Sequence, residues 1–387
     1  MSGPRVVVVG AGVMGLWTAL ELARGGAAVT VVDRAHAAAG SSGLSAGVFT
    51  AQYMNADDVE LRAFSLARLD ELERDHGLAL RRIGLLRLSH DADTTAAFER
   101  SASLQRDHGR ADACVVGPAE VSRLVPHFDG GHVDGAMYSP VEGYLDGAEL
   151  CALLVALAER AGARIAGRTA VTGLRDGGDG ARMTLLTDRG ELPADLVCNC
   201  AGAWVGEVGA ALEAPVGVVN ERHEAYVFEK PAGLETIYPM VLDYVPGDSA
   251  EGIYFRAEGE RQLVAGLHSN EILGHPVADP DDCYAGIHAA SGDEIVARVA
   301  GAFPGLDDIR FRGGWAGLYP HSPDRRPIAG AHPERAGVLV GAGLGGIGLS
   351  LAPVLGRALA ELALDGEVGC VGPELARALA PRAAVLA

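Results

Sequence analysis

The segment RVVVVGAGVMGLWTALELARGGAAVTVVD, residues 5–33, most constrains what this chain can fold into. A short strand pattern runs into Gly10-x-Gly12-x-x-Gly15, an apolar helix pattern follows, and a second strand ends on Asp33. Glycines at this spacing permit a tight turn, close approach of the backbone to a pyrophosphate, and close packing of helix on strand. The helix start offers free N–H groups to phosphate, and the acid can accept hydrogen bonds from ribose hydroxyls. The segment therefore predicts a dinucleotide site.

A second strand–glycine–helix pattern occupies residues 337–366. A nicotinamide dehydrogenase needs one nucleotide-binding turn per cofactor, so a second helix start at Gly343 to Gly348 favours a flavin. The first turn would hold the FAD pyrophosphate, and the C-terminal helix would direct its positive end at the pyrimidine edge of the ring. Such a helix end stabilises the negative charge of reduced flavin by roughly 0.3–1 kcal/mol. An NAD-dependent dehydrogenase, with the second unit serving packing alone, is the alternative.

Composition excludes several classes of partner. The formal net charge of −19 argues against nucleic acid and against an anionic membrane surface. No run of about 18 apolar residues occurs, so we expect no membrane-spanning segment. Of the six cysteines only Cys198 and Cys200 are close, and they lack the second pair that a zinc site needs. We expect no metal, and buried thiols in a cytoplasmic protein.

Helix and strand patterns alternate along the rest of the chain. Helices are expected within residues 57–77, 95–107 and 148–165, and a strand within 81–89. Residues 169–204 are typical of a β-meander, and strand patterns dominate from residue 215 to about 312.

Seven motifs follow one another over nearly the whole length. After residues 5–33 come GSSGLSAG, YSPVEGYLDGAELCALLVALAERAGARI, ADLVCNCAGAW, GIYFRAEGERQLVAGL, GGWAGLYPHSPDRRPIAG and GVLVGAGLGGIGLSLAP. In this order they resemble the D-amino-acid oxidase superfamily of FAD enzymes, in its sarcosine oxidase, dimethylglycine dehydrogenase and glycine oxidase branch. The resemblance implies an α/β fold with a Rossmann-like, discontinuous FAD-binding domain and an α+β substrate-binding domain built on a large mixed or antiparallel sheet. The first would comprise residues 1–80, 141–214 and 319–387, and the second residues 81–140 and 215–318.

The resemblance also implies which residues contact FAD. They are, for the pyrophosphate, Gly10, Gly12, Val13 and Met14; for the adenosine end, Asp33, Arg34 and Val171; for the flavin, Ser41, Ser42, Ser45, Ala46 and Gly47; in a second FAD-contacting turn, Ala201, Gly202 and Trp204; and over the pyrimidine ring, Gly345, Gly346, Ile347, Gly348 and Ser350.

The chain departs from the family pattern in three respects. Gly317 and Leu44 stand where sarcosine oxidases and dimethylglycine dehydrogenases carry the cysteine or histidine that attaches flavin, so we expect non-covalent FAD. Tyr319 replaces a carboxylate-binding arginine, and a phenol supplies one hydrogen bond without charge. Val264 lies near the position of the lysine that activates oxygen, and Lys230 is the only lysine in the chain.

The expected chemistry is oxidation of a C–N bond in a small amine or a secondary or N-substituted amino acid. Hydride would pass to flavin N5, and the imine product would hydrolyse. Catalytic candidates are Tyr319, Tyr254, Arg256 and His268, of which His268 or Tyr254 could accept the proton of the amine. Arg256 as an exposed strand charge and His268 as a structural histidine are the alternatives.

The electron acceptor, O2 or another, and the substrate stay open at this point. A flavin subunit that passes electrons to a partner protein fits the missing lysine equally well. A 2-hydroxy acid is a further possible substrate. The oligomeric state has no signal in the sequence.

Overall fold

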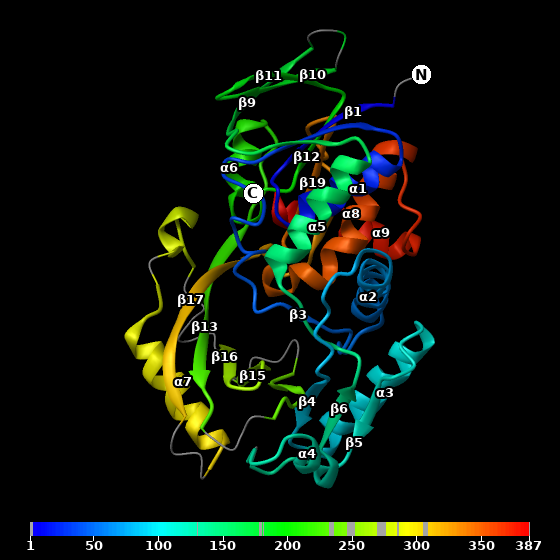
Figure 1. The fold of residues 1–387 in the computed structure, drawn as a ribbon. Helices are drawn as coiled ribbons and strands as arrows, with labels where there is room; N and C mark the ends of the chain where they lie inside the picture. Colours follow the sequence, from blue (N-terminus) through cyan, green and yellow to red (C-terminus); the bar gives the residue numbers. More distant parts are fainter. Residues whose placement is uncertain are drawn as a thin grey trace.

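Two large β-sheets organise the fold, one in the upper and one in the lower half of the view in Figure 1. The computed structural model describes residues 3–129, 131–177, 180, 182–231, 236–245, 252–268, 276–284, 286–304 and 309–386. Every statement below concerns these residues.

The upper sheet has six strands in the order β18-β19-β12-β1-β2-β8. All neighbours are parallel except β18 and β19. Four consecutive valines of β1 are buried, as expected for a central strand covered on both faces. The strands are β1 (Arg5–Val9), β2 (Ala28–Val32), β8 (Arg164–Ala166), β12 (Leu196–Asn199), β18 (Ile328–Ala331) and β19 (Val338–Ala342).

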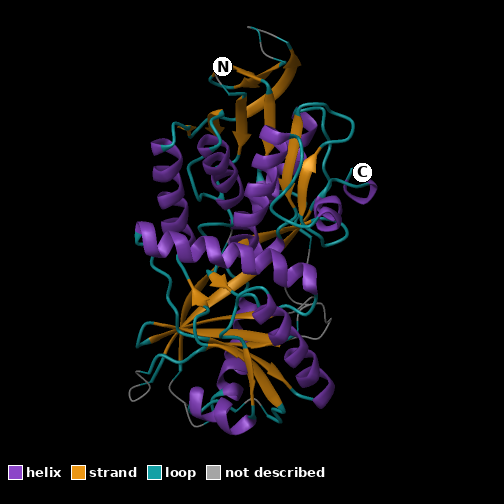
Figure 2. Cartoon of the chain, turned by 90° about the vertical axis from the view of Figure 1, so that its right-hand side faces the viewer, coloured by secondary structure: helices purple, strands orange, loops and turns teal. Residues whose placement is uncertain are grey.

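Helices α1 (Val13–Arg24), α5 (Gly147–Arg160) and α8 (Gly348–Asp365) pack together against this sheet (Figures 1 and 2). Helices α1 and α8 approach closely at Gly356, where an added Cβ would lie 2.8 Å from the Cβ of Trp17. The stretch Gly345–Asp365 is long and apolar enough to cross a membrane by length and composition, with a mean hydropathy of 1.5. Because 61% of that window is buried inside the molecule, it serves here as a core helix.

The lower sheet has eight strands in the order β17-β13-β16-β15-β14-β4-β6-β5. Only β14 and β4 are parallel neighbours in it. One face packs on α7 (Ala289–Ala302) and α4 (Pro118–Leu124), and the other faces the upper half of the molecule. The strands are β4 (Leu85–Ser89), β5 (Cys114–Val116), β6 (Gly135–Ser139), β13 (Val219–Glu229), β14 (Met240–Asp243), β15 (Gly252–Glu258), β16 (Gln262–His268) and β17 (Arg310–His321).

Smaller elements complete the described part. An antiparallel meander of β9 (Val171–Asp176), β10 (Met183–Thr187) and β11 (Gly190–Ala194) precedes β12, and β3 (Val48–Phe49) pairs with β7 (Gly143–Tyr144). The remaining helices are α2 (Ala56–His76), α3 (Ala92–Asp107), α6 (Val205–Ala211) and α9 (Pro373–Leu379), with 3-10 turns η1 (Gly202–Trp204), η2 (Pro280–Tyr284), η3 (Gly345–Ile347) and η4 (Ala383–Val385).

The helices and strands expected from periodicity are present, with one notable difference. Residues 215–312 were expected to be mainly strands, but α7 occupies Ala289–Ala302. Its apolar residues Ile295 and Val299 lie one helical turn apart and are both buried against the lower sheet. Packing of this face stabilises the helix.

Candidate functional site

A cavity of about 470 Å³ lies between the two sheets and brings most of the predicted site residues together. Its lining comes from many parts of the chain. They are the β1–α1 turn, the loop of residues 33–46, residues 169–171, the turn after β12, β13, β15, η2, β17 and the turn after β19. The predicted residues on its wall are Gly10, Gly12, Val13, Met14, Asp33, Arg34, Ser41, Ser42, Ser45, Ala46, Val171, Ala201, Gly202, Trp204, Tyr254, Tyr319, Gly345, Gly346 and Gly348.

Three of the predicted cofactor residues do not line this cavity, namely Gly47, Ile347 and Ser350. Gly47 has a φ of +83°, and an added Cβ would lie 1.9 Å from the carbonyl oxygen of Leu145, so it permits a close chain crossing. Ile347 is the N-cap of α8. The Ser350 hydroxyl donates to the Val48 carbonyl at 3.4 Å.

Two of the predicted catalytic residues are also away from the cavity wall. The Arg256 side chain is buried, donates from Nε to the Ala46 carbonyl at 3.1 Å and pairs with Glu258. Its guanidinium carbon lies 3.7 Å from the ring centroid of Tyr144. Arg256 thus supports the loop that holds Ala46. His268 ends β16, and its side chain lies outside the described part of the structure.

The glycine turn after β1 has the geometry that the sequence predicts. Gly10 has a φ of +106°, and an added Cβ would lie 2.4 Å from the carbonyl oxygen of Cys200. An added Cβ on Gly15 would lie 1.9 Å from the carbonyl oxygen of Gly10. Both positions exclude any side chain, so the turn stays narrow and its backbone stays open to the cavity.

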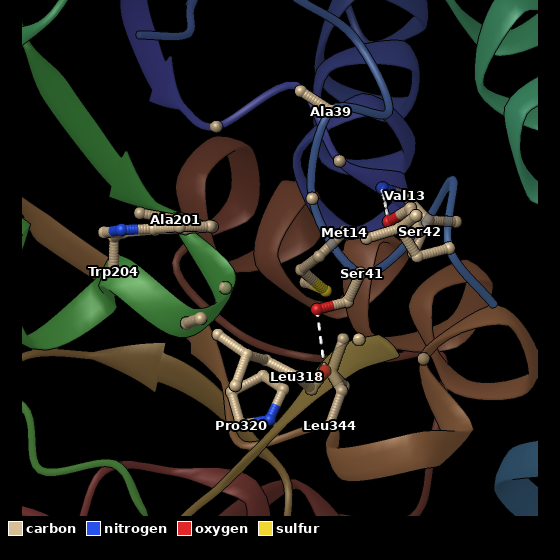
Figure 3. Close-up of a pocket in the computed structure, with 18 of the residues that line it drawn as sticks. Val13, Met14, Ala39, Ser41, Ser42, Ala201, Trp204, Leu318, Pro320 and Leu344 are labelled. Atoms are coloured by element: carbon tan, nitrogen blue, oxygen red, sulfur yellow. Dashed lines mark hydrogen bonds between the residues drawn. The ribbon is translucent and has the colours of Figure 1, made fainter. Parts of the chain in front are cut away.

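The first turn of α1 is turned toward the cavity. Gly12 is its N-cap and provides no side-chain cap. The Val13 N–H donates to the Ser42 hydroxyl at 3.0 Å, which fixes the 33–46 loop over the helix start (Figure 3). Since the N-cap Gly12 has no side chain over the helix start, the positive end of the helix dipole is a favourable place for a pyrophosphate.

Asp33 fixes the same turn from the side of β2. Its Oδ2 accepts from the Ala11 N–H at 2.7 Å, and its Oδ1 accepts from the Ala35 N–H at 2.7 Å. Each carboxylate oxygen retains a lone pair, so the residue can still accept from a hydroxyl in the cavity.

One end of the cavity is closed by Arg34, Trp204 and Asp281. The Arg34 guanidinium carbon lies 4.2 Å from the centroid of the Trp204 ring, and its Nη1 donates to Asp281 at 3.1 Å. The indole Nε1 of Trp204 donates to the same carboxylate at 3.2 Å. The hydrogen bond to Asp281 raises the pKa of Arg34. These three side chains form a flat, charged wall suited to the adenosine end of a nucleotide.

The 33–46 loop is attached to β17 by two hydrogen bonds. The Ser41 hydroxyl donates to the Leu318 carbonyl at 2.7 Å (Figure 3), and the Trp315 indole donates to the Leu44 carbonyl at 2.7 Å. Between them an added Cβ on Gly317 would lie 3.5 Å from the Cβ of Leu44. The two positions that carry flavin-attaching residues in the resembling families are therefore neighbours on one wall.

Two phenol rings form another part of the cavity wall. Tyr254 lies across Gly266, where an added Cβ would be 2.3 Å from the phenol ring. The Tyr319 ring lies beside Gly346, where an added Cβ would be 2.3 Å from the ring. Burial, followed by the proximity of Tyr254 itself, raises the pKa of Tyr319, and burial raises that of Tyr254. Both phenols are therefore protonated donors at neutral pH.

His223 was not among the residues predicted from sequence. It lines the cavity, and its ring stacks on that of Tyr319 with centroids 3.8 Å apart and 18° between the planes. Glu224 also lines the cavity and was missed. The available signal was the run NERHE near the start of β13, which places five consecutive ionisable or amide side chains in a largely buried strand.

Glu221 lies behind these rings. Its Oε2 is 3.6 Å from His223 and 3.5 Å from His321, and Arg325 pairs with its other oxygen. Burial alone would raise the pKa of Glu221, but the histidines and Arg325 together lower it to about 2. Burial lowers the pKa of His321 to about 4, so His321 is neutral at pH 7.

Comparison with known proteins identifies the family. The family model described as "DAO: FAD dependent oxidoreductase" matches residues 5–362. The chain belongs to this family.

Individual relatives agree with this assignment. The chain is 28% identical to mitochondrial sarcosine dehydrogenase of Mus musculus over 94% of its own length, but it spans only 40% of that relative. It resembles the crystal structure of glycine oxidase from Geobacillus kaustophilus with a TM-score of 0.77 and 25% identity, covering 96% of this chain and 97% of the other. L-proline dehydrogenase from P. horikoshii has the same fold, with a TM-score of 0.83, 23% identity and 95% of each chain covered.

These comparisons confirm several predictions. The protein is an FAD-dependent oxidoreductase with a mixed α/β fold, a Rossmann-like unit and large mixed sheets. The family match therefore favours FAD over the alternative of an NAD-dependent dehydrogenase. The structure also fits the cofactor: Gly10 and Gly15 keep the turn free of side chains, and the helix start, whose N-cap Gly12 has no side chain, faces the cavity.

Within the described ranges, no group of three or more His, Cys, Asp or Glu side chains is arranged to hold a metal ion. Cys198 and Cys200 are both buried as free thiols.

Proposed function

We propose that this protein oxidises a C–N bond in a small amine or a secondary or N-substituted amino acid, giving an imine that hydrolyses to a carbonyl compound and an amine. The division predicted above, with an FAD-binding domain of residues 1–80, 141–214 and 319–387 and a substrate-binding domain of residues 81–140 and 215–318, is part of the proposal. So is non-covalent FAD, held by the β1–α1 turn, the 33–46 loop and the turn before α8.

One observation supports this proposal above all others. The cavity that begins at the glycine turn ends among Tyr254, Tyr319 and His223, so a dinucleotide and a small organic substrate can share one enclosed space. Relatives are named for sarcosine and for glycine, which are both small amino acids. Bound FAD would supply the acceptor for the two electrons removed from the substrate.

Side chains of the protein would orient the substrate and accept the proton that its ammonium group loses. An amine transfers hydride from its α-carbon only when the nitrogen lone pair is free, so the ammonium form must lose a proton. His223 is the described imidazole on the cavity wall, and Glu221 lies 3.6 Å from its Nε2 to stabilise a positive charge on the ring. Tyr254 and Tyr319 would hold the substrate as hydrogen-bond donors, and the buried surroundings favour the neutral amine.

The test is a spectral titration of the purified protein. The visible spectrum should contain flavin bands, and anaerobic mixing with a panel of amines should bleach them. The panel should include primary amines, N-methylated amino acids, cyclic secondary amino acids and, as a contrasting class, 2-hydroxy acids. Bleaching by 2-hydroxy acids alone would contradict oxidation of a C–N bond.

A second candidate, a flavin subunit that passes electrons to a partner protein, is favoured by the position of Lys230. Its Nζ donates to the Thr236 carbonyl at 3.0 Å and lies 5.3 Å from the Tyr238 ring centroid, away from the cavity wall. A lysine is therefore not available to assist oxygen in the described cavity. This candidate predicts slow turnover with O2 and fast turnover with an artificial electron acceptor.

A further inference from the structure

Asp281 joins two side chains that come from distant parts of the chain. Its carboxylate accepts from Nη1 of Arg34 at 3.1 Å and also pairs with Nη2 of that guanidinium, so the two planar groups meet as a fork. The same carboxylate accepts from Nε1 of Trp204 at 3.2 Å. Because the guanidinium carbon of Arg34 lies 4.2 Å from the centroid of the Trp204 ring, one acid fixes both members of a stacked pair.

The three residues come from different halves of the fold. Arg34 follows β2 and Trp204 ends η1, which comes shortly after β12, so both are attached to the upper sheet. Asp281 lies in η2, between β16 of the lower sheet and α7. All three line the cavity, and Figure 3 shows Trp204 on its wall. Two side chains of the upper half are thus held in the cavity wall by a residue of the lower half.

The segment that carries Asp281 has anchors of its own. The Val277 N–H donates to the Asn220 carbonyl of β13 at 2.7 Å. Cys283 is 1% exposed and packs against Leu318 of β17. The carboxylate of Asp281 is therefore presented from a fixed place, whether or not its two partners are in position.

Stability of the fold does not explain this arrangement. The side chains of Arg34 and Asp281 are 44% and 54% exposed, and an ion pair as exposed as this contributes little to folding. The hydrogen bond from Arg34 lowers the pKa of Asp281, so the carboxylate is ionised at neutral pH. A ligand that covers the pair would exclude water and strengthen it. Arg34 directly follows Asp33, which retains lone pairs for a hydroxyl in the cavity.

We propose that Asp281 is a positioning residue for FAD: it holds Arg34 and Trp204 against the adenosine end, and so makes retention of the dinucleotide depend on the lower half of the molecule. The inference rests on the non-covalent FAD of the proposed function, with its adenosine end beside Arg34, and it is independent of the substrate. A guanidinium and an indole both offer flat faces to an adenine ring. Asp281 prevents both from rotating away.

The first test is the rate of FAD release from the oxidised holoenzyme, followed as the free flavin that passes an ultrafiltration membrane. Asp281→Asn should speed release about 3- to 10-fold, because it loses a charged but partly exposed hydrogen bond. Asp281→Glu, which keeps the charge, should be intermediate. Asp282→Asn is the matched control, since it removes the same charge from η2 and Asp282 is not among the described residues that line the cavity. It should release FAD at the wild-type rate.

The second test separates positioning from a general disturbance of the fold. The full chain, freed of FAD, is titrated by calorimetry with ADP, which has the adenosine end alone, and with FMN, which lacks it. Asp281→Asn should weaken ADP binding about 3- to 10-fold and leave FMN binding unchanged. In an Arg34→Gln background the same substitution should have a smaller effect on FAD release, because the two residues act as a unit.

Four results would overturn the inference: Asp281→Asn releases FAD at the wild-type rate, Asp282→Asn speeds release as much as Asp281→Asn, wild type does not bind ADP, or Asp281→Asn weakens FMN binding as much as ADP binding. Each can occur while amines still bleach the flavin, in which case the proposed oxidation of a C–N bond stands.

Two further results concern the proposed function. Flavin that stays with wild-type protein even on acid precipitation would overturn the inference together with non-covalent FAD. Failure of every amine to bleach the flavin would instead remove the proposed oxidation, whatever the release rates and the ADP titrations give.

Discussion

The imidazole of His223 and the phenol of Tyr319 are stacked on the cavity wall, with ring centroids 3.8 Å apart and 18° between the planes. The two residues belong to neighbouring antiparallel strands, β13 and β17. Each ring limits the rotation of the other, so the phenol hydroxyl and the imidazole nitrogen are presented to the cavity in a fixed relation. Such fixed orientation is what hydride transfer from a small substrate requires.

Tyr319→Phe should slow flavin reduction by an amine substrate about 10-fold or more, because it removes a hydrogen-bond donor and keeps the stacked ring. Anaerobic stopped-flow measurement of flavin bleaching gives the rate. Tyr238→Phe is the matched control, since Tyr238 is buried against Phe255 and Phe303 and does not line the cavity. Equal rates for both variants would remove Tyr319 from the catalytic set.

His223→Gln should slow flavin reduction by roughly 100-fold at neutral pH, the usual effect of losing a general base. The loss should shrink at high pH, where the amine is already deprotonated in solution. A pH profile of the reduction rate from pH 6 to 10 checks this. A rate loss that is the same at every pH would mean that His223 only positions Tyr319.

Gly346→Ala should lower the FAD content of the purified protein, because the added Cβ would lie 2.3 Å from the Tyr319 ring and would push the turn before α8 away from β17. The ratio of flavin to protein absorbance measures the content. Gly301→Ala is the control, as no atom lies within 4 Å of the added Cβ. It should keep full FAD content and stabilise α7 by about 0.5–1 kcal/mol. Full FAD content in Gly346→Ala would show that the turn can move without loss.

Flavin should leave the protein on acid precipitation, because neither Gly317 nor Leu44 offers a nucleophile on the wall where they are neighbours, with an added Cβ on Gly317 3.5 Å from the Leu44 Cβ. The absorbance of supernatant and pellet near the usual flavin band decides this directly. Colour that stays in the pellet would mean a covalent link through another residue.

Stability should fall with rising pH because of Glu142. This buried carboxyl accepts hydrogen bonds from the Thr50 hydroxyl and the Ala51 N–H, both at 2.7 Å, and burial raises its pKa from 4.5 to about 7. The folded state thus favours the protonated form of Glu142. The contribution of this carboxyl to the free energy of unfolding is complete below about pH 4.5 and is lost as the pH rises through about 7.

Glu142→Gln should remove this dependence, because an amide does not titrate. The difference between the unfolding midpoints at pH 5.5 and pH 8 should be clearly smaller in the variant than in wild type. An unchanged difference would assign the pH dependence to other groups.

Local patterns predicted the parts of the site that local physics determines. The turn at Gly10 and Gly15 needs glycine whatever surrounds it, and Asp33 follows from its place at the end of β2. Most predicted cofactor residues accordingly lie on the cavity wall. Their individual roles toward FAD stay predictions.

Residues whose significance depends on distant partners were not predicted. Arg87 has an ordinary place in a strand pattern, and its burial emerges only when β4 is set beside β14 and β15, more than 150 residues later. His223 gains its position from β17 in the same way. Helix α7 was missed because the strand patterns around it were extended through residues 289–302, although Ile295 and Val299 are at helical spacing.

The strand order of the upper sheet also has a consequence for synthesis on the ribosome. Strand β1 emerges early, yet its parallel partner β12 begins at Leu196, and β19, the next strand beyond it, begins at Val338. Helix α8, which covers α1, ends only at Asp365. The face of α1 that α8 covers must therefore remain exposed, or be held by a chaperone, until more than three hundred further residues have been translated.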